Sequence, residues 1–127
     1  MNILIVDDEE MIRESLKAFL EAQGCFVECA ASAENGLDSL ERNQPDVAVV
    51  DIRLPHKSGN QFILEANAKL PGLKFLIFTG SADYALPPEL CQMGLSEEHV
   101  FQKPLVDLTV LHEAALRCAR ADGKNSR

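Results

Sequence analysis

The sequence contains five short apolar segments, and side chains that can do chemistry end or follow four of them. These side chains are three carboxylates, a hydroxyl and an amine: Asp7, Asp8, Asp51, Thr79 and Lys103. Short runs rich in valine, isoleucine and leucine are typical of strands buried on both faces of a parallel sheet. Ligands bind outside the carboxyl ends of such strands, so we expect the five side chains to share one edge of the sheet.

Together these side chains favour a site for phosphoryl transfer. Three carboxylates placed side by side repel one another, so they require a divalent cation. Mg²⁺ prefers oxygen ligands, keeps several waters and binds phosphate oxygens, and Mn²⁺ is expected to be able to replace it. The Lys103 amine would supply a positive charge, and the Thr79 hydroxyl a hydrogen bond, for a bound anion. Asp51 is the candidate for the reactive carboxylate, because it emerges where the burial of its strand ends.

The order of the apolar segments predicts a single α/β domain. Strands are expected over residues 2–6, 25–30, 46–50, 74–79 and 100–102. Helices are expected before Gly24 and over about 33–42, 60–69, 88–93 and 108–121. Strands that alternate with helices give a parallel sheet with right-handed crossovers. The domain is predicted to cover residues 1–121, and a short flexible tail is predicted over 122–127.

The composition excludes several classes of protein. The 127 residues are 46% hydrophobic and 25% charged, which is typical of a soluble globular domain. A net charge of -8 argues against direct binding to nucleic acid or to an anionic membrane. No apolar run is as long as a transmembrane helix, and no signal segment precedes the first strand. We therefore expect a cytoplasmic protein whose four cysteines are free thiols.

Several motifs resemble the receiver domain of two-component response regulators, including the chemotaxis regulators. They are the run Ile-Leu-Ile-Val-Asp-Asp-Glu-Glu over residues 3–10, residues 51–55 with Gly59, Thr79-Gly80, and Lys103-Pro104. Each motif is short, but all occur in the family's order and approximate spacing, and together they cover nearly the whole chain. The resemblance implies a flavodoxin-like, doubly wound sheet of five parallel strands in the order 2-1-3-4-5.

The resemblance also implies roles for individual residues. Asp51 is the expected phosphoacceptor, which takes a phosphoryl group from the phosphohistidine of a sensor histidine kinase or phosphotransfer protein. Asp8 and Asp51 are expected to bind Mg²⁺ directly and Asp7 mainly through water, and the Arg53 backbone carbonyl completes the protein ligands. Arg53 and Ser81 occupy positions at which receivers tune the lifetime of the phosphoryl group. Such a domain is not an enzyme in the usual sense, because it undergoes only Mg²⁺-dependent self-phosphorylation and slow autodephosphorylation.

Other positions receive roles in holding the phosphoryl group. Lys103 is expected to pair with the phosphoryl group, and Thr79 is expected to hydrogen-bond it. Gly80 corresponds to a position that must be small. Receivers usually have a cis peptide bond between this lysine and the proline that follows it, so Pro104 is expected to be a cis-proline.

The sequence departs from the family pattern at its fifth strand. Receivers generally carry Tyr or Phe three residues before the lysine, and this chain has Val100 there. Phe101 follows, but side chains alternate along a strand, so its ring is expected to face the other side of the sheet. Pro87 and Pro88 limit the fourth helix to a short one. Two alternatives follow: the response to phosphorylation lacks the usual rotation of an aromatic ring, or Phe101 replaces the missing ring.

Three other functions are compatible with an aspartate at a strand end. A receiver-like adaptor that is never phosphorylated would share the fold, although the complete set of five side chains argues against it. A small phosphatase that forms an aspartyl-phosphate would resemble Asp-x-Asp, whereas this chain has Arg53 at the second position. A flavodoxin-like cofactor binder would need a Gly/Ser/Thr-rich loop after the first strand, where this chain has four acids.

The expected output of the domain is contact with a downstream protein target, because 127 residues leave no room for an effector domain. The chain is either a stand-alone protein or a piece of a longer regulator or hybrid kinase, and the sequence leaves both alternatives open.

Overall fold

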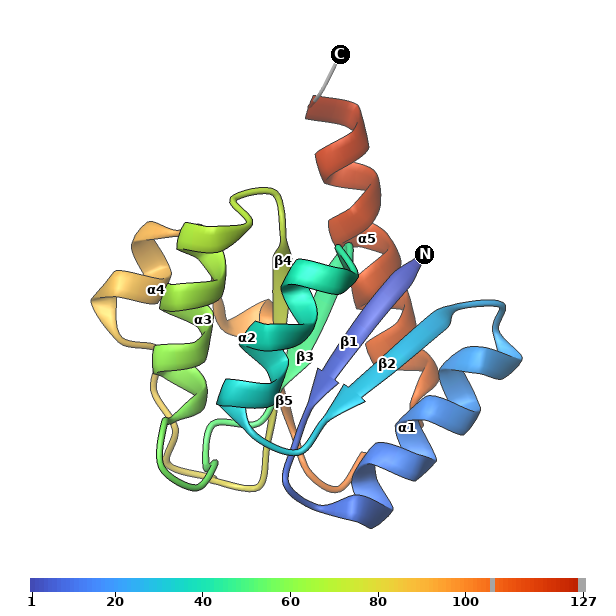
Figure 1. Ribbon diagram of the computed structural model, residues 1–127, viewed down its shortest axis with the longest axis horizontal. Helices are drawn as coiled ribbons and strands as arrows, with labels where there is room; N and C mark the ends of the chain where they lie inside the picture. The colour runs from blue at the N-terminus through green and yellow to red at the C-terminus, as the bar shows by residue number, and fades with distance from the viewer. Residues whose placement is uncertain (106, 126–127) are drawn as a thin grey trace.

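Five parallel strands form one sheet with helices on both faces, as the sequence predicts (Figure 1). The computed structural model describes residues 1–105 and 107–125. The strands are β1 (Asn2–Val6), β2 (Phe26–Ala30), β3 (Val47–Val50), β4 (Lys74–Thr79) and β5 (Val100–Gln102). All neighbouring strands pair in parallel, in the order β2-β1-β3-β4-β5. The predicted doubly wound, flavodoxin-like sheet is therefore confirmed.

The helices divide between the two faces of the sheet. They are α1 (Glu10–Ala22), α2 (Ala33–Arg42), α3 (Gly59–Lys69), α4 (Pro88–Gln92), the 3₁₀ helix η1 (Glu97–His99) and α5 (Thr109–Asn125). Figure 1 shows α1 and α5 on one face, and α2, α3 and α4 on the other. In the described part of the chain, no helix is long and apolar enough to cross a membrane.

Two details of the predicted helices are wrong. The turn η1 was not predicted from the sequence. The final helix continues to Asn125, beyond its expected end at Ala121. Residues 122–125 are therefore helical, and the rest of the expected tail, 126–127, lies outside the described residues. The expected short helix after the two prolines is present as α4.

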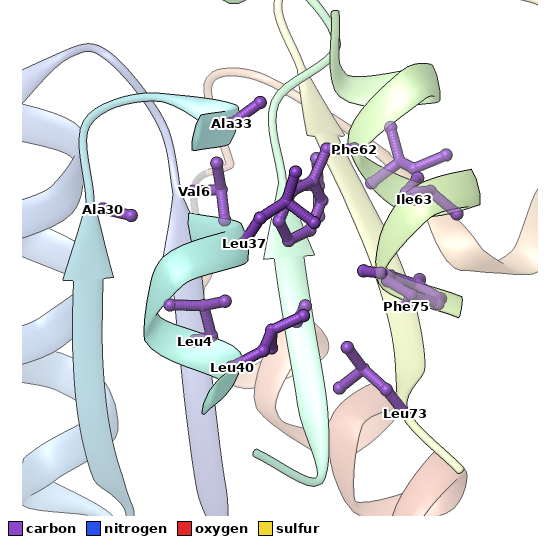
Figure 2. Close-up of a cluster of buried hydrophobic side chains, with 14 of the residues drawn as sticks. Leu4, Val6, Ala30, Ala33, Leu37, Leu40, Phe62, Ile63, Leu73 and Phe75 are labelled. Atoms are coloured by element: carbon purple, nitrogen blue, oxygen red, sulfur yellow. The ribbon is translucent and has the colours of Figure 1, made fainter. Parts of the chain in front are cut away.

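The strand side chains alternate between two apolar clusters, one on each face. In β1, Leu4 lies in the cluster under α2 and α3, whereas Ile5 lies in the cluster under α1 and α5. Figure 2 shows the first cluster, in which Leu37 of α2 and Phe62 of α3 point toward each other above the sheet. Each such side chain stabilises the fold by about 1.5–3 kcal/mol when fully buried. Because both faces of the sheet are covered, β3 is wholly apolar, and β1 and β4 show continuous apolar runs instead of alternation.

Serine caps fix where two helices begin. The Ser32 Oγ accepts a hydrogen bond from the Asn35 N–H at 3.1 Å and so caps the start of α2. At the start of α3, the Ser58 Oγ accepts from the Gln61 N–H at 3.2 Å, and the Gln61 Oε1 accepts from the Ser58 N–H at 3.2 Å. The loop that follows Asp51 therefore ends in a fixed helix start.

Gly59 allows α3 to contact the backbone that carries Asp51. Its N–H donates to the Ile52 carbonyl at 2.9 Å. A Cβ at this position would lie 2.2 Å from the Asp51 carbonyl oxygen and 2.8 Å from the Ile52 Cα. Backbone atoms cannot move aside as a flexible side chain can, so this close approach requires glycine.

We predict that Gly59→Ala destabilises the domain by about 1–3 kcal/mol, because the added methyl group overpacks the end of β3. Urea unfolding of the variant would measure this change in the free energy of unfolding. Gly72→Ala is the matched control, since a Cβ at Gly72 would meet no atom within 4 Å. Equal stability of the two variants would contradict the packing argument.

Candidate functional site

The backbone brings the predicted side chains together by continuing the strand pairing past the strand ends. The Asp7 N–H donates to the carbonyl of the last residue of β2 at 3.1 Å. The Asp51 N–H donates to the last residue of β1 at 2.9 Å, and the Lys103 N–H to the last residue of β4 at 2.8 Å. Three residues from three different strands are thus held at the same edge of the sheet.

Three of the predicted side chains form a carboxylate cluster. Asp7, Asp8 and Asp51 each offer an oxygen, and these oxygens lie within 4.8 Å of one another. Asp7 and Asp51 are buried, at 2% and 4% exposure, whereas Asp8 is exposed. The Arg53 N–H donates to the Asp51 Oδ1 at 3.3 Å, which places the next loop beside the cluster. Oxygen donors gathered in this way fit a hard divalent cation.

Lys103 provides the positive charge of the site. Its Nζ lies 2.8 Å from the Asp7 Oδ2, 2.8 Å from the Glu9 Oε1 and 3.3 Å from the Asp51 Oδ2. The ammonium also lies 5.7 Å from the centre of the Phe78 ring. Our sequence analysis did not assign a role to Glu9. No local signal could have found the ion pair, because it joins residues 94 positions apart.

Burial and charge act in opposite directions at the site. Burial raises the pKa of the Asp51 carboxyl; the Lys103 charge opposes that shift, and the Asp7 charge adds to it. Burial likewise raises the pKa of Asp7, against a hydrogen bond from Lys103. Burial alone would lower the pKa of Lys103, but hydrogen bonds to Asp7 and Glu9 outweigh it and raise this pKa. One charged lysine therefore does not fully offset the buried carboxylates, and a further positive charge would stabilise them.

A cavity opens above Asp51. Its volume is ≈ 320 Å³, and six residues line it: Asp8, Glu9, Asp51, Arg53, Gly80 and Lys103. Thr79 is fully buried at the end of β4, where its hydroxyl accepts a hydrogen bond from the Ser81 N–H at 3.2 Å. The Arg53 Nη2 lies 3.5 Å from the Ser81 Oγ, so the two positions expected to tune the phosphoryl lifetime are neighbours.

Two smaller predictions concern the backbone near the cavity. The Lys103–Pro104 peptide bond is cis, as the resemblance implies. A Cβ at Gly80 would meet no atom within 4 Å, so no neighbouring protein atom requires a small residue there. A small residue at Gly80 is therefore still only predicted, on the expectation that a larger side chain would obstruct a group that enters the cavity.

The aromatic side chains near the site follow the predicted alternation. Val100 packs against the cluster under α2 and α3, and Phe101 packs against the cluster on the opposite face. Tyr84, which our sequence analysis did not single out, packs on the same face as Val100. Its hydroxyl donates to the Asn60 Oδ1 of α3 at 2.8 Å. The loop after Thr79 thus supplies a ring to the face on which Val100 has none.

We predict that, in a chelating buffer at neutral pH, Asp51→Asn raises the free energy of unfolding of the domain, because the variant removes a buried carboxylate charge. The pKa of Asp51 is raised in the native state, so ionised Asp51 costs stability above that pKa. The difference in stability between the variant and the wild type should shrink as the pH falls through the raised pKa of Asp51, because protonation then removes the buried charge of Asp51 in the wild type. Thermal unfolding at several pH values would measure it, with exposed Asp38→Asn as the control. A less stable Asp51→Asn at neutral pH would contradict this account.

Comparison with known proteins identifies relatives of the chain. The sequence profile of the family described as "Response regulator receiver domain" matches residues 3–115. The chain is 30% identical to the transcriptional regulatory protein FixJ of Azorhizobium caulinodans over 115 residues, which covers 91% of this chain and 53% of that protein. FixJ of Bradyrhizobium diazoefficiens is 29% identical over 126 residues, 98% of this chain and 60% of that protein. The chain thus spans less than two thirds of the length of these relatives.

Solved structures share the fold. A response regulator receiver domain protein (CheY-like) from Methanospirillum hungatei JF-1 has a TM-score of 0.85 and 31% identity, covering 98% of this chain and 97% of that one. The response regulator TrrA from Thermotoga maritima, solved in complex with Mg²⁺-BeF, has a TM-score of 0.76 and 25% identity, covering 92% and 97%. The family profile covers most of the chain, and the strand order agrees with the prediction. The chain therefore belongs to the response regulator receiver domain family of two-component systems.

Proposed function

We propose that this domain accepts a phosphoryl group on Asp51 and signals through contact with other proteins. The observation that carries the proposal is the position of the Lys103 ammonium, 3.3 Å from the Asp51 Oδ2 and 2.8 Å from the Asp7 Oδ2. Asp51 and Lys103 line the same cavity, so an anion bonded to Asp51 would lie beside a fixed positive charge. This arrangement suits a group that arrives as an anion and stays attached.

In the proposed reaction, Asp51 is the nucleophile. One carboxylate oxygen attacks the phosphorus of a phosphohistidine; the P–O bond forms as the P–N bond breaks, and the imidazole leaves. Lys103 donates an N–H hydrogen bond to one phosphoryl oxygen. The Thr79 hydroxyl, which accepts a hydrogen bond from the Ser81 N–H, donates an O–H hydrogen bond to a second phosphoryl oxygen. The expected donors are a sensor histidine kinase or a phosphotransfer protein.

The carboxylate cluster fits Mg²⁺ as the cofactor of this reaction. Asp8, Asp51 and the Arg53 backbone carbonyl would hold the ion directly and Asp7 mainly through water, and Mn²⁺ would suit the same oxygens. When bound, the cation neutralises the carboxylates and the incoming phosphoryl oxygens. The Mg²⁺-BeF complex of TrrA supports this assignment by likeness.

The alternatives receive less support from the site. A phosphatase of the Asp-x-Asp type would have its second acid at position 53, but this chain has Arg53 there, with its guanidinium beside the Ser81 hydroxyl. We therefore propose only self-phosphorylation and slow loss of the phosphoryl group. A receiver-like adaptor that is never phosphorylated would not need Lys103 held beside Asp51.

The remaining assignments belong to the same proposal. The receiver domain is assigned to residues 1–121, and its output is contact with a downstream protein target. A net charge of -8 disfavours direct contact with nucleic acid. The FixJ relatives are described as transcriptional regulators and extend beyond the matched segment, so a DNA-binding role would belong to such an extension. A cytoplasmic location follows from the resemblance.

We predict that acetyl phosphate and Mg²⁺ label the wild type on Asp51 and that EDTA abolishes the labelling, because the acid cluster then repels the anion. Intact-mass spectrometry would measure the labelled fraction. Asp51→Asn should remove the label completely, whereas the exposed Asp38→Asn should keep it. Labelling retained in Asp51→Asn would move the site elsewhere.

We predict that phosphorylation changes mainly the segment from Ser81 to Gly94, which follows Thr79 and carries Tyr84. The chain has one tyrosine and no tryptophan, so its intrinsic fluorescence reports on Tyr84 alone. Beryllofluoride with Mg²⁺ should change this fluorescence and the amide exchange of residues 81–94. Asp51→Asn is the control and should show neither change. A change in amide exchange confined to residues 100–103 would instead indicate that Phe101 replaces the missing aromatic residue.

A further inference from the structure

Glu9 extends an exposed carboxylate over the cavity of the site. The Glu9 backbone is fixed by a hydrogen bond in which its N–H donates to the Asp7 Oδ1 at 2.9 Å. Its side chain is 59% exposed, and its Oε1 lies 2.8 Å from the Lys103 Nζ. Glu9 lines the same cavity as Asp51 but does not belong to the three-carboxylate cluster.

The ion pair with Glu9 uses a donor that the proposed reaction needs. An ammonium has three N–H donors, and Asp7, Glu9 and Asp51 all lie within 3.3 Å of the Lys103 Nζ. A phosphoryl group on Asp51 presents three anionic oxygens to an ammonium that has no free N–H. Forming the P–O bond removes the carboxylate charge of Asp51, so its contact with Lys103 passes to the phosphoryl group. A second N–H for this group becomes available only if Asp7 or Glu9 gives up its contact.

Glu9 is the carboxylate that can leave at the lowest cost. Asp7 is 2% exposed, and its Oδ1 already accepts a hydrogen bond from the Glu9 N–H. Moving Asp7 away from Lys103 would therefore leave a buried charge without a partner. Asp51 has no carboxylate charge left to hold Lys103 once it carries the phosphoryl group. The Glu9 carboxylate is 59% exposed and can turn into water, where its charge is solvated, so its contact with Lys103 is the weaker one to break.

We propose that Glu9 is a positioning residue that competes with the phosphoryl group for Lys103 and thereby slows its capture by Asp51. The inference rests on the proposed function and adds a rate-setting side chain to it. Glu9 acts through Lys103 and touches no reacting atom. Its removal should free one lysine donor without removing a ligand of the cation.

The test compares Glu9→Gln with Glu10→Gln in the full chain. Glu10 is exposed, carries the same charge and makes no ion pair within the described residues. The rate of labelling by acetyl phosphate with Mg²⁺ should rise about two- to five-fold in Glu9→Gln, the factor that corresponds to one weak ion pair. Glu10→Gln should change the rate by much less. In a Lys103→Met background, Glu9→Gln should give no further increase.

The affinity for Mg²⁺, measured without a phosphodonor, separates this role from a structural one. It should stay the same in Glu9→Gln, because Glu9 is outside the carboxylate cluster. Slower labelling would show that Glu9 orients Lys103 productively, and weaker Mg²⁺ binding would show that it serves the cation; either result overturns the proposal. Equal acceleration in both glutamine variants would also overturn it, since only through-space charge would then act.

The same experiment distinguishes failure of the inference from failure of the proposed function. If Asp51→Asn abolishes labelling and Glu9→Gln labels at the wild-type rate, the competition is absent while the phosphoacceptor stands. If the wild type is not labelled at all, the proposed function fails and the inference fails with it.

Discussion

The Lys103 ammonium offsets part of the negative charge that the fold gathers at one edge of its sheet. Asp7 and Asp51 are buried, and a buried carboxylate without a partner is strongly unfavourable. Lys103 lies within 3.3 Å of both, and it is placed there by the pairing of its own N–H with the end of β4. The site thus depends on one cation that balances several anions incompletely. This imbalance favours a second cation and, with it, the binding of a phosphoryl group.

The sheet fixes the positions of these charged residues. The strand pairing continues past the ends of β1, β3 and β5, so the residues beyond these strands keep the register of the sheet. On the other side of Asp51, the close contact of Gly59 holds α3 against the backbone. Asp51 therefore sits between the sheet and α3.

The loop after Thr79 is the one best placed to respond. Its first residues link to the site through the Ser81 N–H, and Tyr84 connects it to Asn60 of α3. Val100 and Phe101 face opposite sides of the sheet, and Tyr84 packs on the same side as Val100.

The sequence by itself determined the five-stranded parallel sheet and the carboxyl edge that carries Asp51, because strands buried on both faces leave a local apolar signature that ends in polar residues. Alternation along a strand also predicted the opposite directions of Val100 and Phe101. Only the tertiary structure decided that Glu9 pairs with Lys103 and that Tyr84 reaches Asn60. The physical reason is that periodicity records which face of an element is buried. Contacts between exposed or half-buried polar groups instead depend on the paths of loops and on which elements pack together. No local sequence pattern predicts either of these.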